Sequence, residues 1–142
     1  MTDRQRGVLD TSTVVSLGRL KGAQLPDEPI ITTITLAELS VGPLVATGRK
    51  ERAARQAVLQ QVEADFEPLA FDAEAARAFG RVAASFRSAG RKVQAWAYDA
   101  MIAAIAMANQ LPLYTVNPSD FVGVDGLDVR AVPHPDHLHG GT

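Results

Sequence analysis

Short runs of β-branched and other apolar residues alternate along this chain with longer stretches of helical periodicity. The short runs predict strands, because β-branched residues favour extended structure and turn residues bound each run. Predicted strands cover 7–10, 30–34, 111–116 and 128–132, and 66–71 could add another. The longer stretches predict helices at 13–20, 35–46, 49–64, 72–89 and 97–108, with Thr35 as the N-cap of the second.

Strands that alternate with helices indicate an α/β protein, here a three-layer α/β/α sandwich with a mainly parallel central sheet. No internal repeat or linker divides the chain, so residues 1–133 are expected to form one domain. The segment 134–142 is rich in proline, glycine and histidine, and we predict a disordered tail there. Its three histidines, His134, His137 and His139, are poor candidates for metal ligands because an unordered tail lacks the supporting contacts of real sites.

Four acidic residues fall where such a fold would gather them: Asp10, Glu38, Asp99 and Asp120. Asp10 ends the first strand, Glu38 lies one turn into the helix after the second, and Asp120 follows the 111–116 strand. Asp99 is expected to open the helix that leads into that strand. In parallel sheets ligands bind beyond the carboxyl ends of the strands. All four carboxylates therefore map to one edge.

Three of the four acids also have a simpler interpretation. Asp10 could cap the helix that follows it. The pattern from Thr35 to Glu38 fits a capping box, and Asp120 could make only a turn. Asp99 has no comparably simple interpretation, because it is the only charged residue between positions 97 and 108. A helix this apolar is expected to be buried in the centre of the protein. An unpaired carboxylate there would cost on the order of several kcal/mol.

The amino-acid composition excludes several kinds of active site and metal site. The chain has 142 residues, is 46% hydrophobic and carries no cysteine, so disulfides, thiol catalysis and thiolate zinc sites are excluded. No apolar run reaches the ~18 residues that a membrane span needs, and the polar N-terminus lacks a signal-peptide core, which favours a cytoplasmic protein. The net charge of −2 means that a nucleic-acid partner would need local basic patches or bound cations. The basic residues, including Arg91, are expected to be solvated surface.

Four motifs, VLDTS, TLAEL, AYDAMIAAIA and TVNPSDF, occur in an order and spacing that resemble PIN-domain ribonucleases, specifically the VapC-type toxins of bacterial VapBC toxin–antitoxin pairs. The resemblance covers nearly the whole chain and implies a PIN-like fold. It places the family's acidic metal-binding and catalytic quartet on Asp10, Glu38, Asp99 and Asp120. Accessory polar positions fall on Ser12, Thr115 and Asn117. Val116 departs from the pattern, since many relatives carry arginine there.

The resemblance implies a metal-dependent endoribonuclease that hydrolyses RNA, a cognate VapB-type antitoxin that neutralises it, and a homodimer. Oxygen ligands without cysteine favour Mg²⁺, with Mn²⁺ as the alternative. Two rival hypotheses remain: a catalytically silent PIN-like binding module, and a phosphoacceptor receiver domain. The receiver hypothesis would need a second acid beside Asp10 and a lysine after a late strand. The last lysine of this chain is Lys92, ahead of the 111–116 strand.

Overall fold

The centre of the protein is a sheet of four short parallel strands. A computed structural model describes residues 5–20 and 24–135. The strands are β1 Arg6–Leu9, β2 Glu28–Ile30, β3 Leu113–Thr115 and β4 Val129–Ala131. Their order is β2-β1-β3-β4, so β1 and β3 are the inner strands. In register, Val8 of β1 lies opposite Ile30 of β2 and Leu113 of β3.

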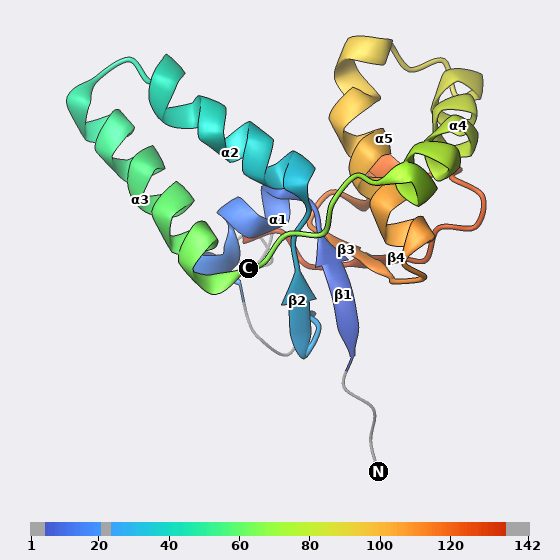
Figure 1. The fold of residues 1–142 in the computed structure, drawn as a ribbon, viewed down its shortest axis with the longest axis horizontal. Helices are drawn as coiled ribbons and strands as arrows, with labels where there is room; N and C mark the ends of the chain where they lie inside the picture. The colour runs from blue at the N-terminus through green and yellow to red at the C-terminus, as the bar shows by residue number, and fades with distance from the viewer. Residues whose placement is uncertain (1–4, 21–23, 136–142) are drawn as a thin grey trace, which may run out of the picture.

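Helices connect the strands and cover the sheet (Figure 1). They are α1 Thr11–Val15, α2 Thr33–Val45, α3 Arg49–Asp65, α4 Ala73–Ser88 and α5 Val93–Ala108, with 3₁₀ turns η1 Leu17–Arg19 and η3 Pro118–Phe121. Helices α2 and α3 form a long antiparallel hairpin, and α4 packs along α5. No helix in the described part of the chain is long and apolar enough to cross a membrane.

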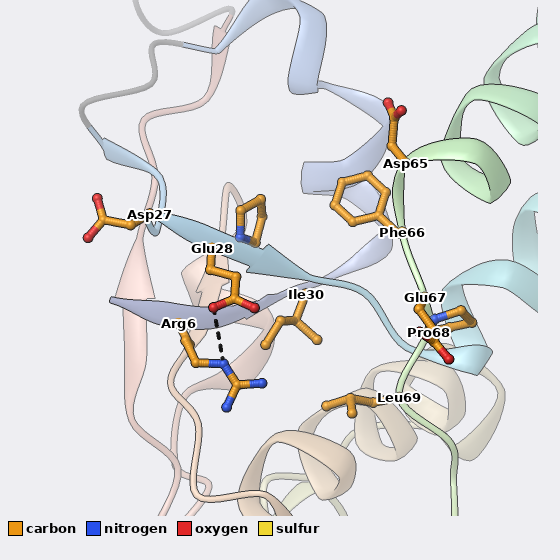
Figure 2. A pocket seen from close by; sticks show the side chains of 10 residues that line it. Arg6, Asp27, Glu28, Ile30, Asp65, Phe66, Glu67, Pro68 and Leu69 are labelled. Carbon is orange, nitrogen blue, oxygen red and sulfur yellow. Dashed lines mark ion pairs between the residues drawn. The ribbon is translucent and has the colours of Figure 1, made fainter. Parts of the chain in front are cut away.

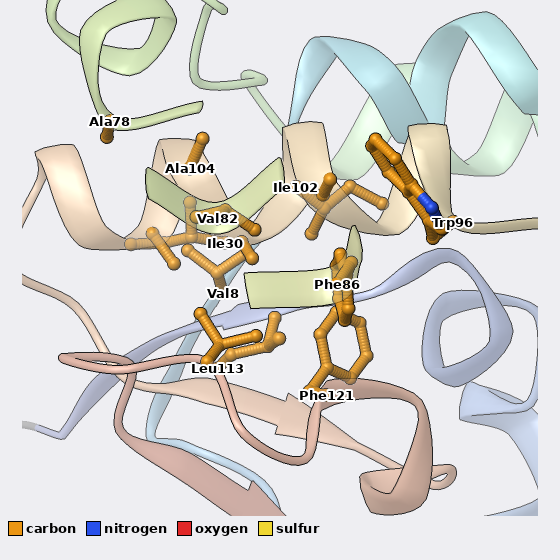
Figure 3. Packing of buried hydrophobic residues seen from close by; sticks show 14 residues of the cluster. Val8, Ile30, Ala78, Val82, Phe86, Trp96, Ile102, Ala104, Leu113 and Phe121 are labelled. Carbon is orange, nitrogen blue, oxygen red and sulfur yellow. The ribbon is translucent and has the colours of Figure 1, made fainter. Parts of the chain in front are cut away.

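Side chains alternate between the two faces of a strand, and each face has its own hydrophobic cluster. On one face, Val8, Ile30 and Leu113 pack with α4 and α5 (Figure 3). On the other, Leu9 and Tyr114 pack with Val14 of α1 and Val62 of α3. The two clusters make three layers, and the predicted α/β sandwich with a parallel sheet is confirmed. Residues 102–106 of α5 are all fully buried, as expected for a central helix.

The second strand is shorter than predicted, and the helix after it begins earlier. The strand ends at Ile30, and Thr32 caps α2 by accepting a hydrogen bond from the amide of Thr35 at 3.2 Å. Thr35 is therefore the third residue of the helix, and its predicted role as N-cap is wrong. The predicted 66–71 strand is reduced to one bridge between Thr32 and Leu69. The first strand begins and ends one residue earlier than predicted, the 111–116 strand loses two residues at its start and one at its end, and the 128–132 strand loses one at each end.

Two predicted helices also have different limits. The 13–20 helix is split, because the amide of Ser16 is shared between the carbonyls of Ser12 and Thr13 and the chain tightens into η1. Helix α5 begins at Val93, four residues before the predicted start at Ala97. Its first turn is anchored by Trp96, which is 5% exposed. Asp99 therefore lies in the second turn, and the prediction that it opens the helix is wrong.

Candidate active site

The four predicted acids come together at the carboxyl edge of the sheet. Asp10 directly follows β1, and Asp120 lies in η3, which follows β3. Glu38 and Asp99 reach the same edge from α2 and α5. Asp99 is close enough to Asp10, Glu38 and Asp120 for the charge of each to raise its pKa. Segments separated by up to 110 positions (from Asp10 to Asp120) thus share one electrostatic environment.

Asp10 is the most buried of the four, with 2% of its surface exposed. Its Oδ1 accepts hydrogen bonds from the amide of Thr13, at 3.3 Å, and from the Thr13 hydroxyl. Its Oδ2 accepts from the Thr115 hydroxyl at 2.8 Å. Burial raises the pKa of Asp10, the bonds from Thr13 and Thr115 oppose that rise, and the charge of Asp120 adds to it. Asp10 does cap α1. Its second oxygen also accepts a hydrogen bond from Thr115 of β3, and a residue that served only as a cap would not need this bond.

Glu38 does not form the predicted capping box. It is the sixth residue of α2, beyond the reach of the helix's first amides. Its Oε1 accepts a hydrogen bond from the Thr11 hydroxyl at 2.7 Å, and that hydroxyl lies 2.9 Å from the hydroxyl of Thr35. Burial raises the pKa of Glu38, the Thr11 bond opposes the rise, and the charge of Asp10 adds to it. The side chain is therefore oriented by the segment that carries Asp10.

The carboxyl group of Asp99 has a pKa well above its ordinary value. Its pKa is raised to about 7, first by burial and then by the charges of Asp120 and Asp10, with a smaller contribution from Glu38. The guanidinium of Arg91 opposes this rise from 4.0 Å away. A carboxyl group that titrates near neutral pH, surrounded by other carboxylates, is typical of functional sites.

The accessory polar residues divide into those that contact the acids and those that do not. Thr115 is fully buried and bonds to Asp10, and its Oγ1 also accepts the amide of Asn117 at 2.9 Å. Asn117 bonds through its backbone, and its carbonyl accepts the amide of Asp120 at 3.0 Å. Ser12 has an exposed side chain that makes no hydrogen bond within the described residues. The two threonines on either side of it make hydrogen bonds to the acids, Thr11 to Glu38 and Thr13 to Asp10, and the accessory role of Ser12 stays a prediction.

Sequence reasoning missed Thr11, Thr13 and Arg91. The threonines flank Ser12 in the VLDTS segment and its continuation, so their position beside Asp10 was the available signal. Arg91 was expected on the solvated surface, yet its side chain is only 26% exposed and contacts the acid-bearing segments. A glycine-basic pair immediately before the helix of Asp99 was the signal for it. His134 lies in the described chain, whereas His137 and His139 lie outside it.

The donor chemistry of the site fits a hard divalent cation. Carboxylate and hydroxyl oxygens are the ligands that Mg²⁺ and Mn²⁺ prefer. Burial and mutual repulsion raise the pKa values of Asp10, Glu38 and Asp99, so added positive charge would favour their ionised forms. Within residues 5–20 and 24–135, no three acidic or histidine side chains are already arranged to hold one ion. The fit therefore concerns the type of donor atom and the charge of the site.

A separate hollow lies away from the four acids. It encloses about 700 Å³ between β2 and the segment that follows α3 (Figure 2). Arg6 and Glu28, which are paired in register on β1 and β2, both line it and form an ion pair at 3.4 Å, with side chains 52% and 48% exposed. None of the four acids lines the hollow, and its charged groups are solvated. The volume of this hollow is therefore no reason to place the active site there.

Known proteins are similar to this one in both sequence and fold. Residues 8–127 match the PIN domain. The chain is 42% identical to Ribonuclease VapC5 of Mycobacterium tuberculosis, over 84% of this chain and 88% of that protein. It is 26% identical to Ribonuclease VapC of Rickettsia bellii, over 91% and 98% of the two chains.

A solved structure has a similar fold. The crystal structure of VapBC-5 from Mycobacterium tuberculosis, a member of the VapBC family of toxin–antitoxin systems, matches with a TM-score of 0.76 and 39% identity. The match covers 89% of this chain and 98% of that one. With the parallel sheet and the acidic edge described above, these similarities establish that the chain belongs to the PIN-domain family, among the VapC ribonucleases.

Proposed function

We propose that this protein is a divalent-cation-dependent endoribonuclease toxin, which cleaves RNA at the acidic edge and is neutralised by a cognate VapB-type antitoxin. The observation that carries the proposal is the convergence of four carboxylates from distant segments on one electrostatic environment, with the pKa of Asp99 raised to about 7. Membership of the family supports the proposed dependence on a divalent cation, since PIN-domain VapC ribonucleases generally depend on divalent metals.

Asp10, Glu38, Asp99 and Asp120 would hold the cation, directly or through water. Mg²⁺ is the proposed ion and Mn²⁺ the alternative, and either would lower the pKa of a bound water and neutralise charge on the scissile phosphate. The chain's own residues prepare the ligands. Thr13 and Thr115 fix both oxygens of Asp10, and Thr11 fixes Glu38, so these two carboxylates lose little rotational freedom on binding.

RNA cleavage by the purified protein tests this proposal. We expect cuts inside single-stranded or looped RNA in the presence of Mg²⁺ or Mn²⁺, no cuts in EDTA, and loss of at least ~10²-fold in rate for Asp10→Asn, because a ligand's charge positions and tunes the metal. Sequencing of the new RNA ends gives the cleavage sites. An inactive wild-type protein that nevertheless binds Mg²⁺ would favour the silent binding module.

The antitoxin has a candidate surface beside the acids. Apolar side chains on α1, α2 and α3 are solvent-exposed: Val15 56%, Val41 50%, Leu44 82%, Val45 61% and Val58 36%. A hollow of about 200 Å³ lies among Val15, Leu39 and Val58, and Glu38 lines it too. An amphipathic helix could cover this surface and direct an arginine toward the carboxylates. A homodimer is proposed from the family alone.

Co-expression with the neighbouring small gene of the source genome tests the partner. We expect a stable complex that suppresses RNA cleavage, and we expect Leu44→Asp to weaken the complex by at least ~10-fold, because a charge would be buried in an apolar contact. Leu44 is 82% exposed, so the free protein should keep its stability and its activity. Harmless expression of the chain alone, together with purification free of any small protein, would count against an antitoxin.

A further inference from the structure

Arg91 lies between the two segments that bring Asp99 and Asp120 to the site. Its Nη1 donates a hydrogen bond to the backbone carbonyl of Asp120 at 2.5 Å. Its Nη2 lies 4.0 Å from Oδ2 of Asp99. The same guanidinium therefore touches η3 and α5, which are joined in sequence only through the rest of α5 and β3.

The arginine is itself firmly held. Its guanidinium carbon lies 4.5 Å from the ring centroid of Phe86, which is fully buried. Its amide donates to the carbonyl of Phe86 at 3.3 Å, and its carbonyl accepts from Nε1 of Trp96 at 3.0 Å. Phe86 in turn packs against Trp96 and Phe121, with ring centroids 5.9 Å and 6.4 Å away (Figure 3). The guanidinium thus rests on the hydrophobic core.

The contacts of Arg91 leave the acidic oxygens available. It bonds to the carbonyl of Asp120, so the carboxylate of that residue is not consumed. At 4.0 Å from Asp99 it attracts the carboxylate without a hydrogen bond to it within the described residues. Only a planar guanidinium can stack on a ring, donate to a carbonyl and face a carboxylate at once, and the point charge of a lysine cannot reproduce this.

We propose that Arg91 is a positioning residue, which fixes the spacing between the Asp99-bearing helix and the Asp120-bearing turn so that both carboxylates can serve one cation. This inference rests on the proposed function, since it assumes that the two acids act together. It differs from two simpler roles. A charge that merely balances the acids could be supplied by lysine, and a charge that only attracts RNA would change KM and leave kcat alone.

Arg91→Lys and Arg91→Met, compared with wild type, separate these roles. Arg77→Lys and Arg77→Met serve as matched controls, because Arg77 is 68% exposed and, within residues 5–20 and 24–135, pairs only with Glu74 of α4. For positioning, we expect kcat at saturating Mg²⁺ to fall by ~10-fold or more in both Arg91 variants, with KM within about threefold of wild type, since small misplacements of catalytic groups are costly. The controls should match wild type.

Cation binding gives a second measurement that does not depend on cleavage. The Mg²⁺ concentration that produces half of the melting-temperature shift should rise by ~10-fold in Arg91→Lys and Arg91→Met, because groups that orient metal ligands affect affinity on this scale. A purely electrostatic role predicts the reverse for Arg91→Met, which removes a positive charge beside the cation. Comparing the variants at equal folded fraction keeps a loss of stability from imitating this result.

Wild-type kcat and Mg²⁺ response in Arg91→Lys would overturn the positioning role while leaving the proposed function intact. Tighter Mg²⁺ binding by Arg91→Met would also overturn it. If wild type itself neither cleaves RNA nor responds to Mg²⁺, the proposed function fails, and this inference fails with it.

Discussion

Replacing Asp99 by asparagine is expected to reduce RNA cleavage by at least ~10²-fold and, at the same time, to make the metal-free protein more stable. The cleavage falls because an amide oxygen is a weaker cation ligand than a carboxylate. The stability rises because the substitution removes a charge from a side chain that burial, Asp120 and Asp10 all disfavour in its ionised form. At pH 8 the gain should be on the order of 2–4 kcal/mol, because the pKa of this mostly buried group is about 7 in the folded state and 3.8 ordinarily.

Thermal melts of both proteins in EDTA and in millimolar Mg²⁺ measure this prediction. Asp99→Asn should melt several degrees higher than wild type in EDTA and should lose most of the response to Mg²⁺. Asp125→Asn is a suitable control, because Asp125 is exposed and lies beside the C-terminal end of α5, near Met107. If Asp99 were only a surface charge, its asparagine variant would be neutral or slightly less stable. A fully active Asp99→Asn enzyme would remove Asp99 from the site.

The stability of the metal-free protein is expected to fall as the pH rises from about 5 to 7. The folded-state pKa of Asp99 is about 7, whereas its ordinary value is 3.8. Between these two values the native state binds more protons than the unfolded state, so each increase in pH favours unfolding. The pKa values of Asp10 and Glu38 are raised as well, which acts in the same direction. The slope approaches ~1.4 kcal/mol per pH unit for each proton by which the two states differ.

Urea unfolding in EDTA at pH 5, 6, 7 and 8 gives these stabilities. Mg²⁺ should reverse the trend, because it binds the ionised native site and contributes ~1.4 kcal/mol at ten times its dissociation constant. Its apparent affinity should weaken below pH 7, where Asp99 takes up a proton. In Asp99→Asn the pH dependence should be shallower. Stability that rises between pH 5 and 7 in EDTA would contradict the coupling of these carboxylates.

The carboxyl edge could be predicted from sequence because its cause is local. Strand and helix periodicity sets which residues follow each strand, and the parallel sheet then brings the strand ends together whatever the side chains are. Asp10, Glu38, Asp99 and Asp120 could therefore be assigned to one edge before any coordinates were known. The all-apolar pattern of α5 likewise indicated a central helix, and residues 102–106 are fully buried.

The limits of elements and the partners of side chains were decided by tertiary contacts. Thr32 and Thr35 are equally good caps in sequence, and the choice of Thr32 accompanies the bridge to Leu69, which lies on a distant segment. The early start of α5 accompanies the burial of Trp96 against Phe86. Neither contact is visible in a local pattern, because each joins residues on different elements.

The sequence by itself determined the layered fold, the central helix and the identity of the four acids. Tertiary structure alone decided that Thr13 and Thr115 hold Asp10, that Thr11 holds Glu38, and that Arg91 contacts the segments of both Asp99 and Asp120. The physical reason is the range of the interactions. Periodicity and turn chemistry act over a few residues, whereas hydrogen bonds and charges act between whatever groups the packed core brings within a few ångströms.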